Sequence, residues 1–205
     1  MDNFKEIIKE IAPFLKEKGF KKKGNTFFIN LNKNYGIINL QKSQDSNKDE
    51  IKFTINFGVY SDLLGQIVDF DYDSSEVPDV WSCQWQVRIG DFMPNLPDFW
   101  WKVQVGDDLS EVISDIIYNM QKIILPEIGK RLTDEELMNS LVKGDFTEST
   151  AIETFKYLTI FLKAKGDIKD LDDVVEKFMQ GPDGQKYYDI ATEHLEDIDY
   201  NYIKK

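Results

Sequence analysis

Residues 51–59 read IKFTINFGV, and this stretch decides the fold class. Apolar side chains occupy every second position, which is the period of a β-strand with one buried face. Residues 81–89, WSCQWQVRI, alternate in the same way. Two further runs at 26–31 and 36–43 are separated by a short polar loop, which predicts a hairpin. Because no helix of crossover length fits between most of these runs, we expect a mainly antiparallel sheet.

Helical patterns lie on both sides of this strand region. Apolar residues between Phe4 and Leu15 recur at the three- and four-residue spacing of one helix face. A broader apolar stripe predicts a long central helix over 108–125, which we expect Pro126 to end because proline lacks a backbone N–H. Residues 99–105 are predicted as one more strand, which gives a sheet of about five strands.

The rest of the chain also follows a helical pattern. Short helices, broken at glycine and proline, are predicted after about residue 130. We therefore expect an α+β fold, in which a mainly antiparallel sheet packs on an N-terminal helix and a long central helix. The predicted domains are an α+β domain at 1–130 and a helical C-terminal extension at 131–205.

The chain has 205 residues, with 25 Lys+Arg against 37 Asp+Glu and a net charge of −12. The charge is regional, since residues 1–52 carry +4, residues 53–128 carry −10 and residues 129–205 carry −6. Three consecutive lysines at 21–23 form either a solvated corner or an anion-attracting one. Binders of nucleic-acid backbones and of anionic membranes need clustered cations. We therefore expect neither as a partner, and the oligomeric state stays open.

One cysteine and one histidine exclude an internal disulfide and a cysteine-based zinc cage. Cys83 is predicted to be buried and inert, since a nucleophilic thiol needs a cationic or imidazole neighbour. His194 stands among acidic residues and is predicted to lie on the surface. We assign no catalytic residues, no metal site and no cofactor. The N-terminus lacks the uninterrupted apolar stretch of a secretory signal, so we expect a soluble cytoplasmic protein.

The densest acidic cluster reads DFDYD at 69–73, and Glu76 follows it. As a calcium loop it fails, because Ser74 stands where glycine is needed and Val80 where a bidentate glutamate is needed. A solvated acidic loop and a protein-binding or metal-binding loop both remain open. The interleaved aromatics favour protein contact, because aromatic side chains anchor interfaces. We assign partner contact to Asp69, Phe70, Asp71, Tyr72, Asp73 and Glu76.

The polar side of the predicted sheet carries amides, hydroxyls and one arginine, which is unusual for a plainly solvated face. If the sheet curves, these side chains line a shallow groove, in which Arg88 would clamp a carboxylate or phosphate. A wet outer face, or a network covered by the C-terminal helices, remains open as well. The candidate ligand-binding residues are Asn39, Gln41, Asn56, Gln86 and Arg88.

Five ordered blocks of sequence resemble a known family. They are GFKKKGNTF at 19–27, INLQKS at 38–43, FTINFGV at 53–59, WQVRIG at 85–90 and FWW at 99–101. On these blocks, residues 5–125 resemble the bacterial family catalogued as domain of unknown function 4304. The resemblance implies no established activity and no catalytic residues. By analogy, small acidic bacterial proteins of this kind resemble the immunity proteins of toxin systems.

These observations lead to one expectation and two alternatives. We expect a non-catalytic, cytoplasmic, immunity-like binding protein that engages a basic protein partner through the acidic region at 62–79. The first alternative is a protein that binds a small anionic ligand on the polar sheet face around Arg88. The second is a metal-assisted enzyme that uses Asp69, Asp71 and Asp73. It ranks last because no acid/base pair with a perturbed pKa can be argued.

Overall fold

The computed structural model describes residues 3–96, 98–146 and 149–202. The chain divides into two compact units, and it passes between them three times. The first unit consists of Met1–Ser61 and Glu76–Leu132, and the second of Asp62–Ser75 and Thr133–Lys205. The acidic segment Asp62–Ser75 thus groups with the C-terminal helices, which its place in the sequence did not reveal.

The first unit contains a six-stranded sheet in which every pairing is antiparallel. Its strands are β1 (Lys21–Lys23), β2 (Thr26–Leu31), β3 (Asn34–Lys42), β4 (Glu50–Tyr60), β5 (Trp85–Arg88) and β6 (Trp101–Gln104). They follow the order β1-β2-β3-β4-β5. The long strand β4 pairs with β6 along Glu50–Phe53 and with β5 along Asn56–Val59. The predicted α+β fold with a mainly antiparallel sheet is confirmed.

The hairpin between β2 and β3 turns on Asn32 and Lys33. Both residues have positive φ, 50° and 75°. Two consecutive left-handed residues make the type I′ turn, whose twist matches that of the flanking strands. The loop is therefore two residues long, and β3 begins at Asn34, earlier than the predicted start at 36.

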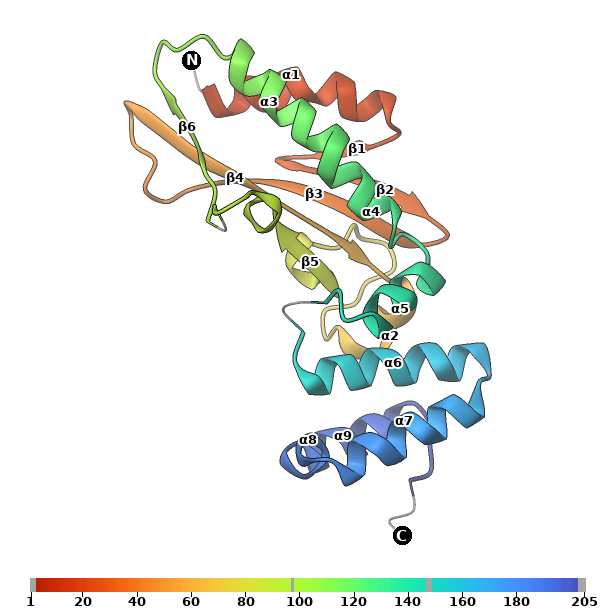
Figure 1. The fold of residues 1–205 in the computed structure, drawn as a ribbon. Helices are drawn as coiled ribbons and strands as arrows, with labels where there is room; N and C mark the ends of the chain where they lie inside the picture. The colour runs from red at the N-terminus through yellow and green to blue at the C-terminus, as the bar shows by residue number, and fades with distance from the viewer. Residues whose placement is uncertain (1–2, 97, 147–148, 203–205) are drawn as a thin grey trace. The chain divides into compact units, whose positions relative to one another are not determined.

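The core lies between the apolar face of the sheet and two helices, α1 (Asn3–Glu17) and α3 (Ser110–Asn119), which lie side by side over it (Figure 1). Phe53 is fully buried in β4, with its ring centroid 5.7 Å from that of Phe4 in α1. On its other side Phe53 stacks on Trp101 of β6, with the centroids 5.4 Å apart. The alternation read from residues 51–59 thus places every second side chain in this core.

The central helix runs further than predicted. It continues from α3 through a π-helical turn at Met120–Ile124 into α4 (Leu125–Gly129). The expectation that Pro126 ends the helix is therefore wrong. In a regular α-helix the proline ring meets the carbonyl of the residue four positions earlier, here Lys122. Because Lys122 lies in the wider π turn, the helix accommodates Pro126 near the start of its next α-helical segment.

The strand predicted at 81–89 is shorter in the structure. A 3₁₀ turn at Val80–Ser82 precedes it, and Asp79 caps this turn by accepting a hydrogen bond of 3.1 Å from the backbone N–H of Trp81. Only Trp85–Arg88 forms a strand, and a second 3₁₀ turn follows at Ile89–Phe92. Side-chain alternation could not reveal a local cap that competes with the sheet.

The second unit is helical over its described residues. Its helices are α2 (Asp62–Val68), α5 (Asp134–Val142), α6 (Ala151–Lys165), α7 (Ile168–Gln180), α8 (Pro182–Lys186) and α9 (Tyr188–Asp197). Thr133 and Thr150 begin α5 and α6 with capping boxes, each using the glutamate three residues on. Phe155 of α6 stacks on Phe178 of α7 with ring centroids 4.1 Å apart. In the described part of the chain, no helix has the length and apolar character needed to cross a membrane.

Candidate functional site

The polar face of the sheet carries one continuous row of side chains across four strands. Thr26 of β2 lies opposite Asn39 of β3, and Asn39 lies opposite Asn56 of β4. Asn56 in turn lies opposite Arg88 of β5. Residues directly opposite one another in an antiparallel sheet share a face. The predicted set at Asn39, Asn56 and Arg88 therefore does come together.

Hydrogen bonds join the members of this row in two pairs and tie Asn56 to Gln41, a neighbour on the same face. The Asn39 amide donates to Thr26 Oγ1 at 2.9 Å. The Asn56 amide donates to Gln41 Oε1 at 2.8 Å. Arg88 Nε donates to Asn56 Oδ1 at 3.3 Å. These bonds hold the side chains in fixed orientations, which is how binding sites are preorganised.

The guanidinium of Arg88 already has an acidic partner. Its Nη1 donates to Asp98 Oδ1 at 3.0 Å, and the same oxygen accepts from the indole N–H of Trp100 at 2.8 Å. The guanidinium also lies 5.2 Å from the centroid of the Trp100 ring. The Asp98 side chain is 77% exposed. An anionic ligand would therefore have to replace Asp98, and the exposure of that carboxylate makes its displacement inexpensive.

Two buried polar atoms on this face have no hydrogen-bond partner among the described residues, Thr54 Oγ1 and Gln86 Oε1. Thr54 lies opposite Gln41, and Gln86 lies opposite Gly58. Buried polar atoms are nearly always satisfied in folded proteins, by protein, water or a ligand. These two atoms mark the positions where a polar ligand atom or a water molecule would be held.

The acidic loop after α2 is locally ordered by its own side chains. The hydroxyl of Tyr72 donates to Asp62 Oδ1 at 2.8 Å, which closes the loop on the helix, and this bond raises the pKa of Tyr72. Asp73 Oδ1 accepts from the Ser75 hydroxyl at 2.7 Å and its N–H at 2.8 Å, and these bonds lower the pKa of the carboxyl group. The Phe70 side chain, unlike that of Tyr72, is fully exposed to solvent.

The predicted partner-contact residues do not all belong to one unit. Asp69, Phe70, Asp71, Tyr72 and Asp73 lie in the second unit, and Glu76 lies in the first. Asp69 Oδ1 accepts the backbone N–H of Asp71 at 3.1 Å, so it too supports the loop. Across residues 3–96, 98–146 and 149–202, no group of three or more His, Cys, Asp or Glu side chains is arranged to hold a metal ion.

The net charge of the chain is distributed unequally between the units. The first unit contains 16 basic and 16 acidic residues and is neutral. The second contains 9 basic and 21 acidic residues, a balance of −12. The second unit therefore accounts for the whole net charge of the protein, although the sequence shows three regions of +4, −10 and −6.

Neither Cys83 nor His194 is an exposed reactive group. Burial raises the pKa of the Cys83 thiol well above its ordinary value, and a repulsive contribution from Asp79 adds to this, so Cys83 is buried and unreactive as predicted. The prediction of a surface His194 is wrong, since the residue is 2% exposed. Its Nε2 lies 2.8 Å from the Thr159 hydroxyl oxygen. Sequence spacing could not show that α6 and α9 face each other there.

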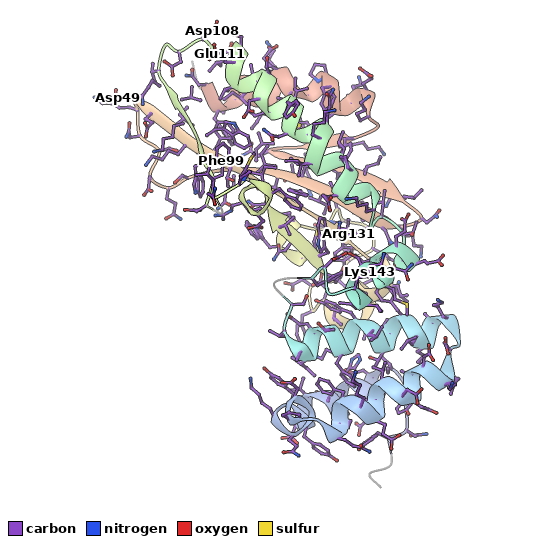
Figure 2. The ribbon with its side chains drawn as sticks, viewed as in Figure 1. Asp49, Phe99, Asp108, Glu111, Arg131 and Lys143 are labelled. Carbon is purple, nitrogen blue, oxygen red and sulfur yellow. The ribbon has the colours of Figure 1, made fainter. Side chains whose placement is uncertain are left out.

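Arg131 is a buried cation that the sequence patterns missed; Figure 2 shows it just after α4. The centre of its guanidinium lies 4.1 Å from the Trp85 ring centroid, and Nη1 donates to Glu127 Oε2 at 2.7 Å. Burial alone raises the pKa of Glu127, but hydrogen bonds from Lys130 and Arg131 outweigh it, so the net pKa is lowered. Glu127 is therefore an ionised partner of Arg131 at neutral pH.

The spacing of Asp108 and Glu111 predicts a capping box before the central helix, but this box does not form, since the N-cap residue of α3 is Leu109, whose side chain does not cap the helix. Asp108 and Glu111 lie together at the start of α3 (Figure 2), and with Asp107 they line a hollow of about 420 Å³. Lys102 of β6 lines the same hollow. Asp108 Oδ1 accepts from the backbone N–H of Ser110 at 2.9 Å, which lowers the pKa of the carboxyl group. The position of these carboxylates at the start of α3 accounts for their clustering, so no ligand is needed to explain it.

The fold and the polar row define an α+β protein with one mainly antiparallel sheet, helices on its apolar face and a linked set of polar side chains on the other. Residues 11–129 match the family described as Domain of unknown function (DUF4304). This match spans more than half of the chain, and the protein belongs to that family; residues 130–205 lie outside the matched region. No curated protein and no solved structure matches the chain.

Proposed function

We propose that this protein is a non-catalytic, immunity-like binding protein that engages a basic protein partner through the loop at residues 69–73. The observation that carries the proposal is the charge of the second unit, −12, together with the fully exposed Phe70 on that unit's own acidic loop. An acidic surface steers a basic partner to the right region, and an exposed aromatic side chain anchors it.

Residues of the loop have separate structural and electrostatic roles, and these roles support the proposed function. The hydrogen bond from Tyr72 to Asp62 orders the loop before a partner binds. Binding therefore does not have to order the segment that carries Phe70. A preordered loop loses less conformational entropy on binding than a mobile one. Asp73 has a lowered pKa and is therefore ionised at neutral pH, as attraction to a basic partner requires. The single buried cysteine suits a reducing cytoplasm.

The test is a pull-down from the native host with immobilised protein at about 0.05 M and about 0.5 M salt. We expect a basic protein that is retained at low salt and released at high salt. Phe70→Ser should weaken its capture, because it removes the anchor and nothing else. Tyr118→Ser is the matched control, since Tyr118 is also an exposed aromatic residue but belongs to the first unit.

A second pair of variants tests how much the charge of the loop contributes to capture of the partner. Asp69→Asn with Asp71→Asn should reduce capture, whereas Asp183→Asn with Asp189→Asn changes the charge of the same unit by the same amount away from the loop. Equal losses in the two double variants would mean that net charge alone, and not this loop, recruits the partner. Capture of no basic protein, or capture that is insensitive to both Phe70→Ser and salt, would contradict the proposal.

A second candidate function is recognition of a small anionic ligand on the polar sheet face. It is favoured by the hydroxyl of Thr54, unpartnered among the described residues, which can donate to an anion and lies on the same face as Asn56 and Arg88. The pairing of Arg88 with Asp98 counts against it unless Asp98 moves aside. This candidate therefore ranks second.

A further inference from the structure

The first unit has a groove between α1 and the edge strand β1 that neither proposal above uses. Its volume is about 750 Å³, which is within the range of ligand-binding clefts. Phe20 and Phe27 form its floor, and both are buried. Lys9 and Lys16 of α1 stand on one wall, and Lys22 of β1, which lies opposite Phe27 and shares its face of the sheet, stands on the other. The groove is therefore apolar at its base and cationic along both sides.

These lysines are available to a ligand. Lys9, Lys16, Lys21 and Lys22 are all exposed. Lys9 approaches Glu10 at 3.9 Å, at the limit of an ion pair, with both side chains largely in solvent. Within the described residues, Lys16, Lys21 and Lys22 form no ion pair. Three cations at one groove, Lys9, Lys16 and Lys22, are the reverse of the overall net charge of −12.

The shape of the groove selects the kind of ligand. Lys9 and Lys16 are seven residues apart on α1, which is two turns or about 10.5 Å along the helix. Ala12 and Pro13 lie between them and continue the apolar surface. Cations at this spacing fit carboxylates that are also seven residues apart on a second helix. A single-headed amphiphile such as a fatty acid has one carboxylate and would leave the lysine of the opposite wall unneutralised.

We propose that this groove binds an acidic amphipathic helix of another protein. The apolar stripe of that helix packs on Ala12, Pro13 and the accessible edge of Phe20. Carboxylates on one flank pair with Lys9 and Lys16, and a carboxylate on the other flank pairs with Lys22. This is recognition of an amphipathic helix in a groove, with charge complementarity at the rim. The proposal is independent of the acidic loop, which attracts a partner of the opposite sign.

The probe is a synthetic 15-residue helical peptide with a leucine stripe flanked by glutamates at seven-residue spacing. Fluorescence anisotropy of the labelled peptide measures its affinity for the full-length protein. Lys16→Glu with Lys22→Glu should weaken binding by about tenfold or more, since two attractions become repulsions. The control is Lys42→Glu with Lys48→Glu, which makes the same charge change at exposed lysines of the same unit, and it should stay within about twofold.

A scrambled peptide of equal composition separates shape from charge. We expect it to bind about tenfold more weakly than the probe, because its leucines no longer form one stripe. Amide shift changes in a two-dimensional NMR spectrum should be confined to residues 5–29. Equal binding of both peptides, equal loss in the two double variants, shift changes elsewhere, or no binding at about 1 mM peptide would each overturn the proposal. Far-UV circular dichroism verifies that both double variants are folded.

Discussion

The guanidinium of Arg131 lies 4.1 Å from the centroid of the Trp85 ring, so a residue just beyond the end of the central helix packs on the strand β5. Arg131 is 7% exposed and is paired with Glu127, whose side chain is 15% exposed. Removing a cation that is held between an aromatic face and a carboxylate, both shielded from water, costs more stability than removing one member of a surface ion pair.

Arg131→Ala should therefore lower the free energy of unfolding of the first unit by about 3 kcal/mol, because it leaves Glu127 without its buried partner. All four tryptophans, Trp81, Trp85, Trp100 and Trp101, belong to the first unit, so the fluorescence change in urea reports on that unit alone. Lys130→Ala is the control. It removes the other, mostly exposed cation beside Glu127 and should cost about 0.5 kcal/mol. Similar losses in the two variants would contradict the assignment.

His194 should make the second unit sensitive to acid. Its pKa is lowered to about 4, mainly by burial and in smaller part by nearby Lys156, while Asp197 acts in the opposite direction. The folded state thus takes up the proton less readily than the unfolded state, whose ordinary pKa is 6.5. The stability contributed by neutral His194 is complete above pH 6.5 and is lost as the pH falls through 4, by about 3 kcal/mol.

The measurement is urea unfolding followed by far-UV circular dichroism between pH 7 and pH 4, for the native protein and His194→Gln. The variant lacks the titrating ring and should lose less stability over this interval. The difference between the two proteins isolates His194 from the many carboxylates that also titrate. Parallel loss of stability in both proteins would show that protonation of His194 is not responsible.

Gly58→Ala tests the close approach of the segment before β5 to the centre of β4. A Cβ atom at position 58 would lie 2.5 Å from the Trp85 carbonyl oxygen and 2.9 Å from Cys83 Cβ. Because backbone atoms must move, the free energy of unfolding should fall by about 2 kcal/mol, as seen by tryptophan fluorescence. Gly129→Ala meets no atom within 4 Å and should leave stability unchanged or slightly raised. A neutral Gly58→Ala would mean that β5 is loosely held.

Asp98→Asn tests whether the polar sheet face accepts an anion. The substitution frees the Arg88 guanidinium from its carboxylate at a cost of about 0.5 kcal/mol or less, since Asp98 is largely exposed. Inorganic phosphate at about 10 mM should then shift the Arg88 Nε–H signal in the variant more than in the native protein. The Nε–H signal of Arg131, the other arginine of the sequence and a buried one, serves in the same spectra as the control for non-specific salt effects. Identical titrations of the native protein and Asp98→Asn would eliminate this site.

The sequence predicted the polar row more fully than it predicted the residues around it. Alternation at 51–59 places Thr54 and Asn56 on one face, because successive side chains of a strand point to opposite sides. It could not show that Asp98 reaches Arg88, since that contact joins a loop to a strand ten residues away through side chains alone. The π turn that accommodates Pro126 was likewise hidden, because a proline within an apolar stripe usually signals a helix end.

Local periodicity and composition were therefore sufficient for the α+β class, the antiparallel sheet and the presence of a dense acidic segment, and the family came from the resemblance of five sequence blocks. These properties depend on neighbours within a few residues of each other. The grouping of Asp62–Ser75 with the C-terminal helices came only from tertiary structure, and with it a neutral first unit and a second unit of charge −12. Electrostatic attraction acts through space rather than along the chain, so counting charges by sequence region could not find this division.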